Sequence, residues 1–237
     1  MRLTIHQPEF LPWLGFLHKI SLAETVVILD DIQYRHQYFQ NRNKIRTKEG
    51  WTWMIIPVRH QALDEWQINM VEIDEKIRWR RKIIGSIEVN YSKCPFFTEY
   101  WPELKEIFNR DYKQLIDLNM EIIRFLFRVF EMERKILFSS EFGLTSKKGE
   151  LVFDICKKMG ATTYISGISG KEYLDMARFE HAEIPVEFQE FHHPVYQQRY
   201  SPFIPCMSSI DLLFNHGPNS KHILQGVGVE TIESIFT

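Results

Sequence analysis

The sequence predicts an α/β fold with a mainly parallel sheet, crossover helices and a helical middle segment. A strand at Arg2–Ile5, a helix within Phe10–Ser21 and a β-branched strand at Thr25–Leu29 follow one another at the N-terminus. A second helix and strand follow at Gly149–Met159 and Thr162–Ile165. Strands that alternate with helices along a chain are typical of α/β proteins with a parallel sheet.

The N-terminal unit contains the first candidate site. Leu14, Leu17 and Ile20 recur with near-helical spacing, so a helix is expected to connect the first strand to the second. Such a crossover makes the two strands parallel, and ligands of parallel sheets tend to lie at the carboxyl ends of the strands. His6 and the pair Asp30–Asp31 fall at these ends.

The middle of the chain changes from strands to helices. We expect Tyr34–Lys48, which is polar and weakly periodic, to form an irregular functional loop, and Trp51–Val58 and Ile68–Ile73 to form strands. From Lys76 to Phe130 the pattern becomes helical. One amphipathic helix within this stretch is predicted by apolar residues three or four positions apart: Leu115, Leu118, Ile122, Phe125, Leu126 and Val129.

The second half contains a glycine loop at the end of a predicted strand. The helix at Gly149–Met159 stops at Gly160, a typical helix terminator, and the strand after it leads into Ser166–Lys171. Glycines in that loop allow close approach of the backbone to a ligand. A further strand is predicted at Val186–Phe191. The C-terminal part is expected to be largely irregular because of four prolines, which are Pro194, Pro202, Pro205 and Pro218.

Length and charge restrict the class of protein. The 237 residues, 44% of them hydrophobic and 25% charged, predict one globular domain over residues 1–237, with a mainly helical insertion or subdomain at 76–148. A formal net charge of -2 gives no overall attraction to nucleic acid, which is therefore not expected as a partner. The chain begins without the apolar core of a signal peptide, and Arg124 and Arg128 interrupt its most apolar stretch. We therefore expect a cytoplasmic protein without membrane insertion.

His6, Asp30 and Asp31 are the candidate catalytic residues. A histidine at a strand end suits proton transfer or binding of a phosphate oxygen, although it can also simply cap a turn. The aspartates could act as general bases, orient His6 or hold a divalent cation; they could equally be solvated or capping carboxylates. A metal is not assigned, because a third carboxylate such as Glu9 or Asp211 would have to be brought close by the fold.

Two loops are candidate substrate-binding segments. Asn41, Arg42 and Asn43 combine a cation with amides that bind phosphate or sugar hydroxyls, beside aromatic residues such as Tyr34. A solvated loop is the alternative. Ser166–Lys171 lacks the glycine six positions before the lysine that a Walker motif requires, but its backbone N–H groups can still bind an anion. Common hydrolase, zinc-protease and dinucleotide motifs are not found in the sequence.

Several longer motifs resemble the WbqC-like proteins of bacteria. The resemblance covers nearly the whole chain and rests on Ile5–Pro8, Leu11–Gly15 with Lys19, Leu29–Tyr34, Gln40–Ile45, Tyr164–Leu174 and Ser208–Asn215. One departure from the family pattern is Ile168, where a proline is expected. The architecture also resembles that of nucleotidylyltransferases with a His-x-Gly-His signature, but Trp13-Leu14-Gly15-Phe16 occupies those positions.

The family resemblance implies a role in O-antigen or other surface-polysaccharide biosynthesis, without a settled reaction or cofactor. We expect a transferase acting on a nucleotide-linked or amino sugar, a small-molecule substrate. The alternatives are a non-catalytic binding or scaffolding protein and a metal-dependent hydrolase. The expected substrate-binding residues are Gln7, Trp13, Tyr34, Asn41, Arg42, Asn43, Ser166, Gly167, Ser169 and Lys171.

Overall fold

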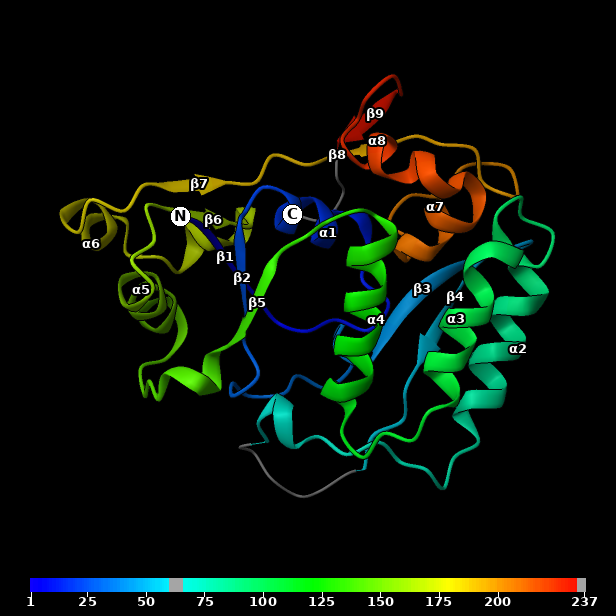
Figure 1. Ribbon diagram of the computed structural model, residues 1–237, viewed down its shortest axis with the longest axis horizontal. Coiled ribbons are helices and arrows are strands. Elements are labelled where there is room, and N and C mark those ends of the chain that lie inside the picture. Colours follow the sequence, from blue (N-terminus) through cyan, green and yellow to red (C-terminus); the bar gives the residue numbers. More distant parts are fainter. Residues whose placement is uncertain (60–65, 234–237) are drawn as a thin grey trace.

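A parallel five-stranded sheet forms one half of the molecule in the computed structural model, which describes residues 1–59 and 66–233 (Figure 1). Its strand order is β5-β2-β1-β6-β7, and all four neighbouring pairs are parallel. The predicted α/β fold with a parallel sheet is therefore confirmed. The strands are β1 (Arg2–His6), β2 (Thr25–Ile28), β5 (Lys135–Phe138), β6 (Thr163–Ser166) and β7 (Val186–Phe188).

Helices connect these strands, as their alternation in the sequence predicts. Helix α1 (Leu14–Ser21) lies between β1 and β2, and α4 (Leu115–Val129) precedes β5. Helix α5 (Lys148–Lys158) leads into β6, and α6 (Met176–His181) separates β6 from β7. Parallel strands require such crossovers, because consecutive strands must start from the same edge of the sheet.

The two faces of the sheet are covered by different helices. Val26 and Ile28 of β2 pack in one hydrophobic cluster with residues of α1 and α4, whereas Val27 packs in another with residues of α5 and α6. Leu3 and Ile5 of β1 belong to the second cluster. Successive strand residues point to opposite faces, so both faces are apolar and the sheet is the middle of three layers.

The other half of the molecule contains a hairpin and helices. Strands β3 (Arg42–Thr47) and β4 (Gly50–Ile55) pair antiparallel, and α2 (Trp79–Tyr91) and α3 (Phe97–Asn109) follow them. In Figure 1 this hairpin is drawn on the other side of α4 from the five-stranded sheet. The remaining elements are η1 (Ile68–Met70), η2 (Ser139–Phe142), η3 (Ile168–Glu172), β8 (His192–Pro194), α7 (Ser209–His216), η4 (Gly217–Asn219), α8 (Ser220–Leu224) and β9 (Thr231–Glu233).

Three sequence predictions of local structure were wrong. The expected loop at Tyr34–Lys48 contains β3. The sequence pattern does not indicate this strand, because polar Asn43 occupies one of its buried positions. Ile68–Ile73 begins with the 3-10 turn η1 instead of a strand. The C-terminal part is not largely irregular, since α7 begins after its N-cap Ser208, whose hydroxyl accepts from the backbone N–H of Ile210.

Residues 76–148, expected to be mainly helical, hold α2, α3 and α4, and also β5 of the main sheet.

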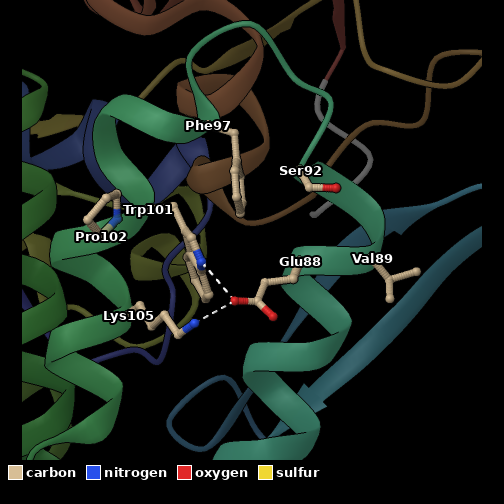
Figure 2. Close-up of a pocket in the computed structure, with 7 residues that line it drawn as sticks. All are labelled: Glu88, Val89, Ser92, Phe97, Trp101, Pro102 and Lys105. Atoms are coloured by element: carbon tan, nitrogen blue, oxygen red, sulfur yellow. Dashed lines mark hydrogen bonds and ion pairs between the residues drawn. The ribbon is translucent and has the colours of Figure 1, made fainter.

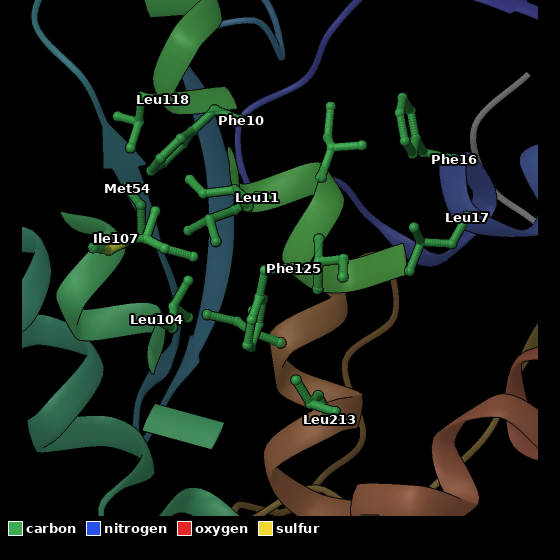
Figure 3. Packing of buried hydrophobic residues seen from close by; sticks show 14 of the residues in the cluster. Phe10, Leu11, Phe16, Leu17, Met54, Leu104, Ile107, Leu118, Phe125 and Leu213 are labelled. Carbon is green, nitrogen blue, oxygen red and sulfur yellow. The ribbon is translucent and has the colours of Figure 1, made fainter. Parts of the chain in front are cut away.

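The largest hydrophobic cluster joins the two halves (Figure 3). Phe10 and Leu11, from the loop after β1, lie beside Leu118 and Phe125 of α4, and all four are fully or almost fully buried. Each such side chain contributes about 1.5–3 kcal/mol when it is removed from water. The core therefore fixes the loop that follows His6 and gives that strand end a defined structure.

Candidate active site

The carboxyl end of β1 lies at the point where the strand order of the sheet reverses. From β1, the chain adds β2 and β5 on one side of the sheet and later adds β6 and β7 on the other. Open parallel sheets form ligand crevices at such switch points. The last paired residues of β1 and β6 are Thr4 and Ile165, and two positions further along these strands lie His6 and Gly167. The fold thus brings His6 and the Ser166–Lys171 loop to one edge.

His6 is held in one orientation at this edge. Its Nδ1 lies 3.0 Å from the carbonyl oxygen of Gln7. A carbonyl only accepts, so Nδ1 carries the hydrogen, which leaves the lone pair of the neutral ring on Nε2. The ring of Phe16 lies 4.7 Å away, edge to face. Burial and, secondarily, the charge of Lys19 lower the pKa of His6 to about 3, so the imidazole is neutral at physiological pH.

Buried Glu9 and Lys19 complete an ionisable cluster with half-buried His6. Lys19 reaches back from α1, is only 6% exposed, and donates a hydrogen bond of 2.9 Å to the carbonyl oxygen of Ile5. Glu9 is 5% exposed, and its buried Oε2 has no hydrogen-bond partner in the structure. Burial raises the pKa of Glu9 and lowers that of Lys19, and each charge partly opposes the shift of the other.

Sequence reasoning missed the importance of this pair. Lys19 lies in a helix of eight residues in which only His18 and Ser21 are not buried. A lysine in so apolar a helix must bury its ammonium group, and Glu9 stands in a similar position between Pro8 and Phe10. An ionisable residue inside an apolar run was the available signal.

Asp30 connects β2 to the segment after β5. Its Oδ1 accepts from the Ser139 hydroxyl at 3.0 Å and from the backbone N–H of Ser140 at 2.9 Å, and its Oδ2 accepts from the Ser140 hydroxyl at 2.6 Å. The Ser139 hydroxyl also contacts the carboxylate of Asp31. These contacts give both aspartates a structural role at the carboxyl end of β2. Asp30 also lines a cavity of about 480 Å³ with Asn69 and Tyr112.

Gln7 connects the β1 loop to Gln40, just before β3. The Gln40 side-chain amide donates to Oε1 of Gln7 at 2.7 Å, and its own oxygen accepts from the backbone N–H of Arg35. Tyr34, which directly precedes Arg35 in the chain, has a buried hydroxyl without a hydrogen-bond partner in the structure. Burial, which the charge of Arg42 opposes, raises the pKa of Tyr34 to about 12, so the hydroxyl stays protonated.

The side-chain amides of Asn41 and Asn43 donate hydrogen bonds to backbone carbonyl groups. The Asn41 amide donates to the carbonyl oxygen of Ile56 at 3.0 Å. The Asn43 amide donates to the carbonyls of Phe10 at 3.3 Å and Leu11 at 2.8 Å. Both residues therefore anchor the β3–β4 hairpin, and they leave Arg42 between them with a guanidinium that is only partly buried.

Trp13 forms a wall at the start of α1. Its indole covers Gly15 so closely that a Cβ added there would lie 2.2 Å from the ring. The ring meets Phe191 edge to face, with centroids 5.5 Å apart. Gln189, just after β7, donates to the carbonyl of Gly15 and to Nδ1 of His18, both at 2.9 Å. These hydrogen bonds hold the end of β7 against α1.

The Ser166–Lys171 loop folds tightly after β6. Ser166 is fully buried and donates to the carbonyl oxygen of Gly167 at 3.0 Å. At Gly170 a Cβ would lie 2.0 Å from the Ser166 hydroxyl oxygen, so glycine is required by close contact. Ser169 and Lys171 are exposed, and Lys171 lies 5.1 Å from the ring centroid of Phe188. Among the loop residues expected to bind substrate, only Ser169 and Lys171 have side chains exposed to solvent.

A larger hollow of about 680 Å³ lies elsewhere, between α2 and α3 (Figure 2). Glu88 accepts there from the Trp101 indole N–H at 3.1 Å and from Lys105 at 2.8 Å. The two groups satisfy this carboxylate and lower the pKa of Glu88, with Lys105 as the main cause. The ionisable cluster of His6, Glu9 and Lys19 contributes no residue to this hollow.

The comparison with known families agrees with the motifs that surround this strand end. The model of the WbqC-like protein family matches residues 7–223. The chain belongs to the WbqC-like protein family. This WbqC-like chain is 29% identical over 231 residues to an uncharacterized protein of Mycobacterium tuberculosis, an alignment that covers 94% of the chain and 97% of that relative. No solved structure matches it significantly.

Neither a membrane-spanning helix nor a cluster of metal ligands is found in the part of the WbqC-like chain that the structure describes. Within residues 1–59 and 66–233, no helix combines the length and apolar character needed to cross a membrane. In the same ranges, His, Cys, Asp and Glu side chains do not form a group of three or more that could hold a metal ion.

Proposed function

We propose that this WbqC-like chain is a cytoplasmic transferase that acts on a nucleotide-linked or amino sugar for O-antigen or another surface polysaccharide. The observation that carries the proposal is the cluster of half-buried His6 with buried Glu9 and Lys19 at the switch point of the sheet. Buried groups with displaced pKa values gather at catalytic sites, because chemistry at neutral pH requires them. The family resemblance supports the pathway, since it implies association with surface-polysaccharide gene sets.

His6 orients the attacking group of the acceptor. The lone pair on its Nε2 accepts a hydrogen bond from a sugar hydroxyl or amino group, while the bond from Nδ1 to Gln7 fixes the ring. A neutral ring suits this role because a positively charged ring could only donate. We therefore assign His6 a positioning and hydrogen-bond-accepting role rather than the binding of a phosphate oxygen.

Glu9 and Lys19 balance charge during transfer. Because burial raises the pKa of Glu9 and lowers that of Lys19, the two groups compete closely for one proton. The pair can therefore take up or release a proton at small cost as charge develops on the neighbouring reactants. Asp30 and Asp31 support the adjacent strand end in this proposal, through Ser139 and Ser140.

We assign the predicted binding residues to the substrate. Arg42 and Lys171 attract anionic groups, and Trp13 and Tyr34 form walls beside a ring. Backbone N–H groups of Gly167 and Ser169 serve as further anion donors in this proposal. Asn41 and Asn43 act indirectly, by fixing the hairpin that carries Arg42.

A ligand screen followed by product analysis tests the proposal. Nucleotide sugars that raise the thermal midpoint are incubated with candidate acceptors, and products are identified by mass spectrometry. His6→Ala should abolish turnover and leave the thermal midpoint nearly unchanged. His181→Ala, an exposed histidine in α6, is the matched control. A folded His6→Ala variant with full activity would overturn the assignment.

The low pKa of His6 favours a second candidate function. A ring with a pKa of about 3 is a weak base, and this agrees with a protein that holds a sugar precursor for partner enzymes without reacting. Such a protein binds the same ligands in the screen but forms no product with any acceptor. Its His6→Ala variant loses affinity instead of turnover.

A further inference from the structure

The outer face of the β3–β4 hairpin presents exposed Trp51 and half-buried Trp53 beside cations. Strand residues alternate in direction, so Asn43, Ile45 and Met54 point inward and are buried. On the outer face Lys44 pairs with Trp53, and Trp51 is 44% exposed. We call Arg42, Lys44, Trp51 and Trp53 the Trp–Arg stripe. Large exposed aromatic side chains grouped on one face are typical of a binding surface.

The cations of the Trp–Arg stripe are held at defined positions. The Arg42 guanidinium lies 4.3 Å from the ring centroid of Trp53. The Lys44 ammonium lies 4.3 Å from the ring of Trp51 and 5.2 Å from that of Trp53. The two indoles are almost perpendicular, with centroids 5.6 Å apart. Cation–π contacts of this kind restrict both partners before a ligand arrives.

The charge on the stripe distinguishes it from an ordinary surface cation–π pair. Arg178 lies 4.2 Å from the ring of Phe153, but Glu150 and Asp154 neutralise it at 3.3 and 3.4 Å. Among the ion pairs between residues of 1–59 and 66–233, none involves Arg42. Its charge is therefore available to an anionic ligand.

The stripe runs outward from the candidate active site. At its inner end, Arg42 lies close enough to Tyr34 to affect the pKa of that buried hydroxyl. The Gln40–Gln7 hydrogen bond connects the residues before Arg42 to the loop that begins at His6. At the outer end, Trp51 pairs with Arg46, which lies about 13 Å along the strand from Arg42 at ~3.3 Å per residue. A ligand that occupies both ends must be extended.

We infer that the Trp–Arg stripe binds the nucleoside diphosphate part of the substrate. The base stacks on Trp51, the diphosphate lies against Lys44 and Arg42, and the attached sugar extends toward Gln7 and His6. The inference rests on the proposed function, and it names the surface that recognises the activated half of the donor. A base can stack on an aromatic side chain whatever its identity, and charge-assisted hydrogen bonds hold the phosphates.

Binding of nucleoside diphosphates to the full chain tests this inference. UDP, GDP, ADP and CDP are titrated separately, with tryptophan fluorescence and calorimetry as readouts. At least one should bind and quench fluorescence, and Trp51→Leu and Arg42→Gln should each weaken it about tenfold or more. Arg178→Gln, the matched cation–π control, should bind as the wild type does. The corresponding nucleoside and inorganic pyrophosphate should each bind more weakly than the diphosphate.

Three results would overturn the inference. These are failure of all four diphosphates to bind, unchanged affinity in both stripe variants, and tighter binding of single-stranded oligouridine that increases with its length. The last would assign the stripe to nucleic acid. His6→Ala separates the inference from the proposed function, because it should retain diphosphate affinity. If nucleoside diphosphates bind through the Trp–Arg stripe but no nucleotide sugar is turned over, the proposed transferase function is refuted and the binding inference stands.

Discussion

The ammonium group of Lys19 donates a 2.9 Å hydrogen bond to the carbonyl oxygen of Ile5, from helix α1 back to strand β1. This contact holds a buried cation at the residue that directly precedes His6 in β1. It also places that cation within electrostatic reach of buried Glu9. The properties of the candidate site therefore depend on three ionisable groups together.

Glu9 and Lys19 should be energetically coupled. Lys19→Met removes a buried hydrogen bond and leaves Glu9 without its compensating charge, so we expect a loss of about 1–3 kcal/mol in unfolding free energy. Glu9→Gln combined with Lys19→Met should cost less than the sum of the single changes, by about 0.5–3 kcal/mol. Urea denaturation of the four proteins measures this difference. Additive costs would show that the two groups act independently.

Acid should destabilise the protein through its buried histidines. Burial lowers the pKa of His6 to about 3 and that of His193 to about 4, whereas an unfolded histidine has a pKa of about 6.5. Below pH ~6.5 the unfolded state binds protons that the folded state does not, so the unfolding free energy falls as the pH falls. Each histidine contributes at most ~1.4 kcal/mol per pH unit.

Denaturation of wild type and His6→Gln at several values between pH 7 and 4.5 isolates the part due to His6. The variant should show a shallower slope, by about one proton. Glu9, whose pKa burial raises, contributes with the opposite sign in both proteins and cancels in the comparison. Exposed His192→Gln is the control. Equal slopes for wild type and His6→Gln would refute the buried, neutral state of His6.

The glycine loop should tolerate a methyl group at one position and not at another. Gly170→Ala places a Cβ 2.0 Å from the Ser166 hydroxyl oxygen, which should cost about 1–3 kcal/mol by overpacking. At Gly167 nothing lies within 4 Å and the backbone φ is -68°, so Gly167→Ala should be nearly neutral. Ser166→Ala should recover part of the loss in Gly170→Ala. Thermal midpoints of these variants decide the matter.

Asp30 should matter more for stability than Asp31. Asp30→Ala leaves both the N–H and the hydroxyl of Ser140 without their shared acceptor, whereas the Ser139 hydroxyl can still donate to Asp31, at an expected cost of about 3 kcal/mol. Asp31→Ala should cost about 1 kcal/mol, because Asp31 is partly exposed and accepts from Ser139 only. An Asp30→Ala variant of unchanged stability that lacks turnover would instead support a catalytic carboxylate.

Hydrophobic periodicity predicted the sheet half of the molecule well. Strands β1, β2 and β6 and helices α1, α4 and α5 lie within or near their expected ranges, because both faces of this sheet are buried against apolar helices. Strand β3 escaped prediction because Asn43 and Arg46 fill buried positions, where hydrogen bonds to backbone replace apolar contacts. A hydropathy pattern does not reveal buried positions that are filled by hydrogen-bonded polar side chains.

The candidate site was predictable in position but not in composition. His6 lies at a strand end, which an alternating pattern of strands and helices makes visible in sequence. The roles of Glu9 and Lys19 depend on burial and on a contact between α1 and β1, which only the packed structure reveals. The amides of Asn41 and Asn43 have the composition of a binding loop, yet their partners are carbonyl groups of neighbouring segments.

The two hydrogen bonds from the Asn43 amide to Phe10 and Leu11 have a mechanical consequence. Phe10 directly follows Glu9 in the chain, so the hairpin and the carboxylate are parts of one stiff connection. The position of Glu9 relative to Lys19 therefore depends on how the hairpin packs, and a shift of the hairpin would change the proton affinity of this pair.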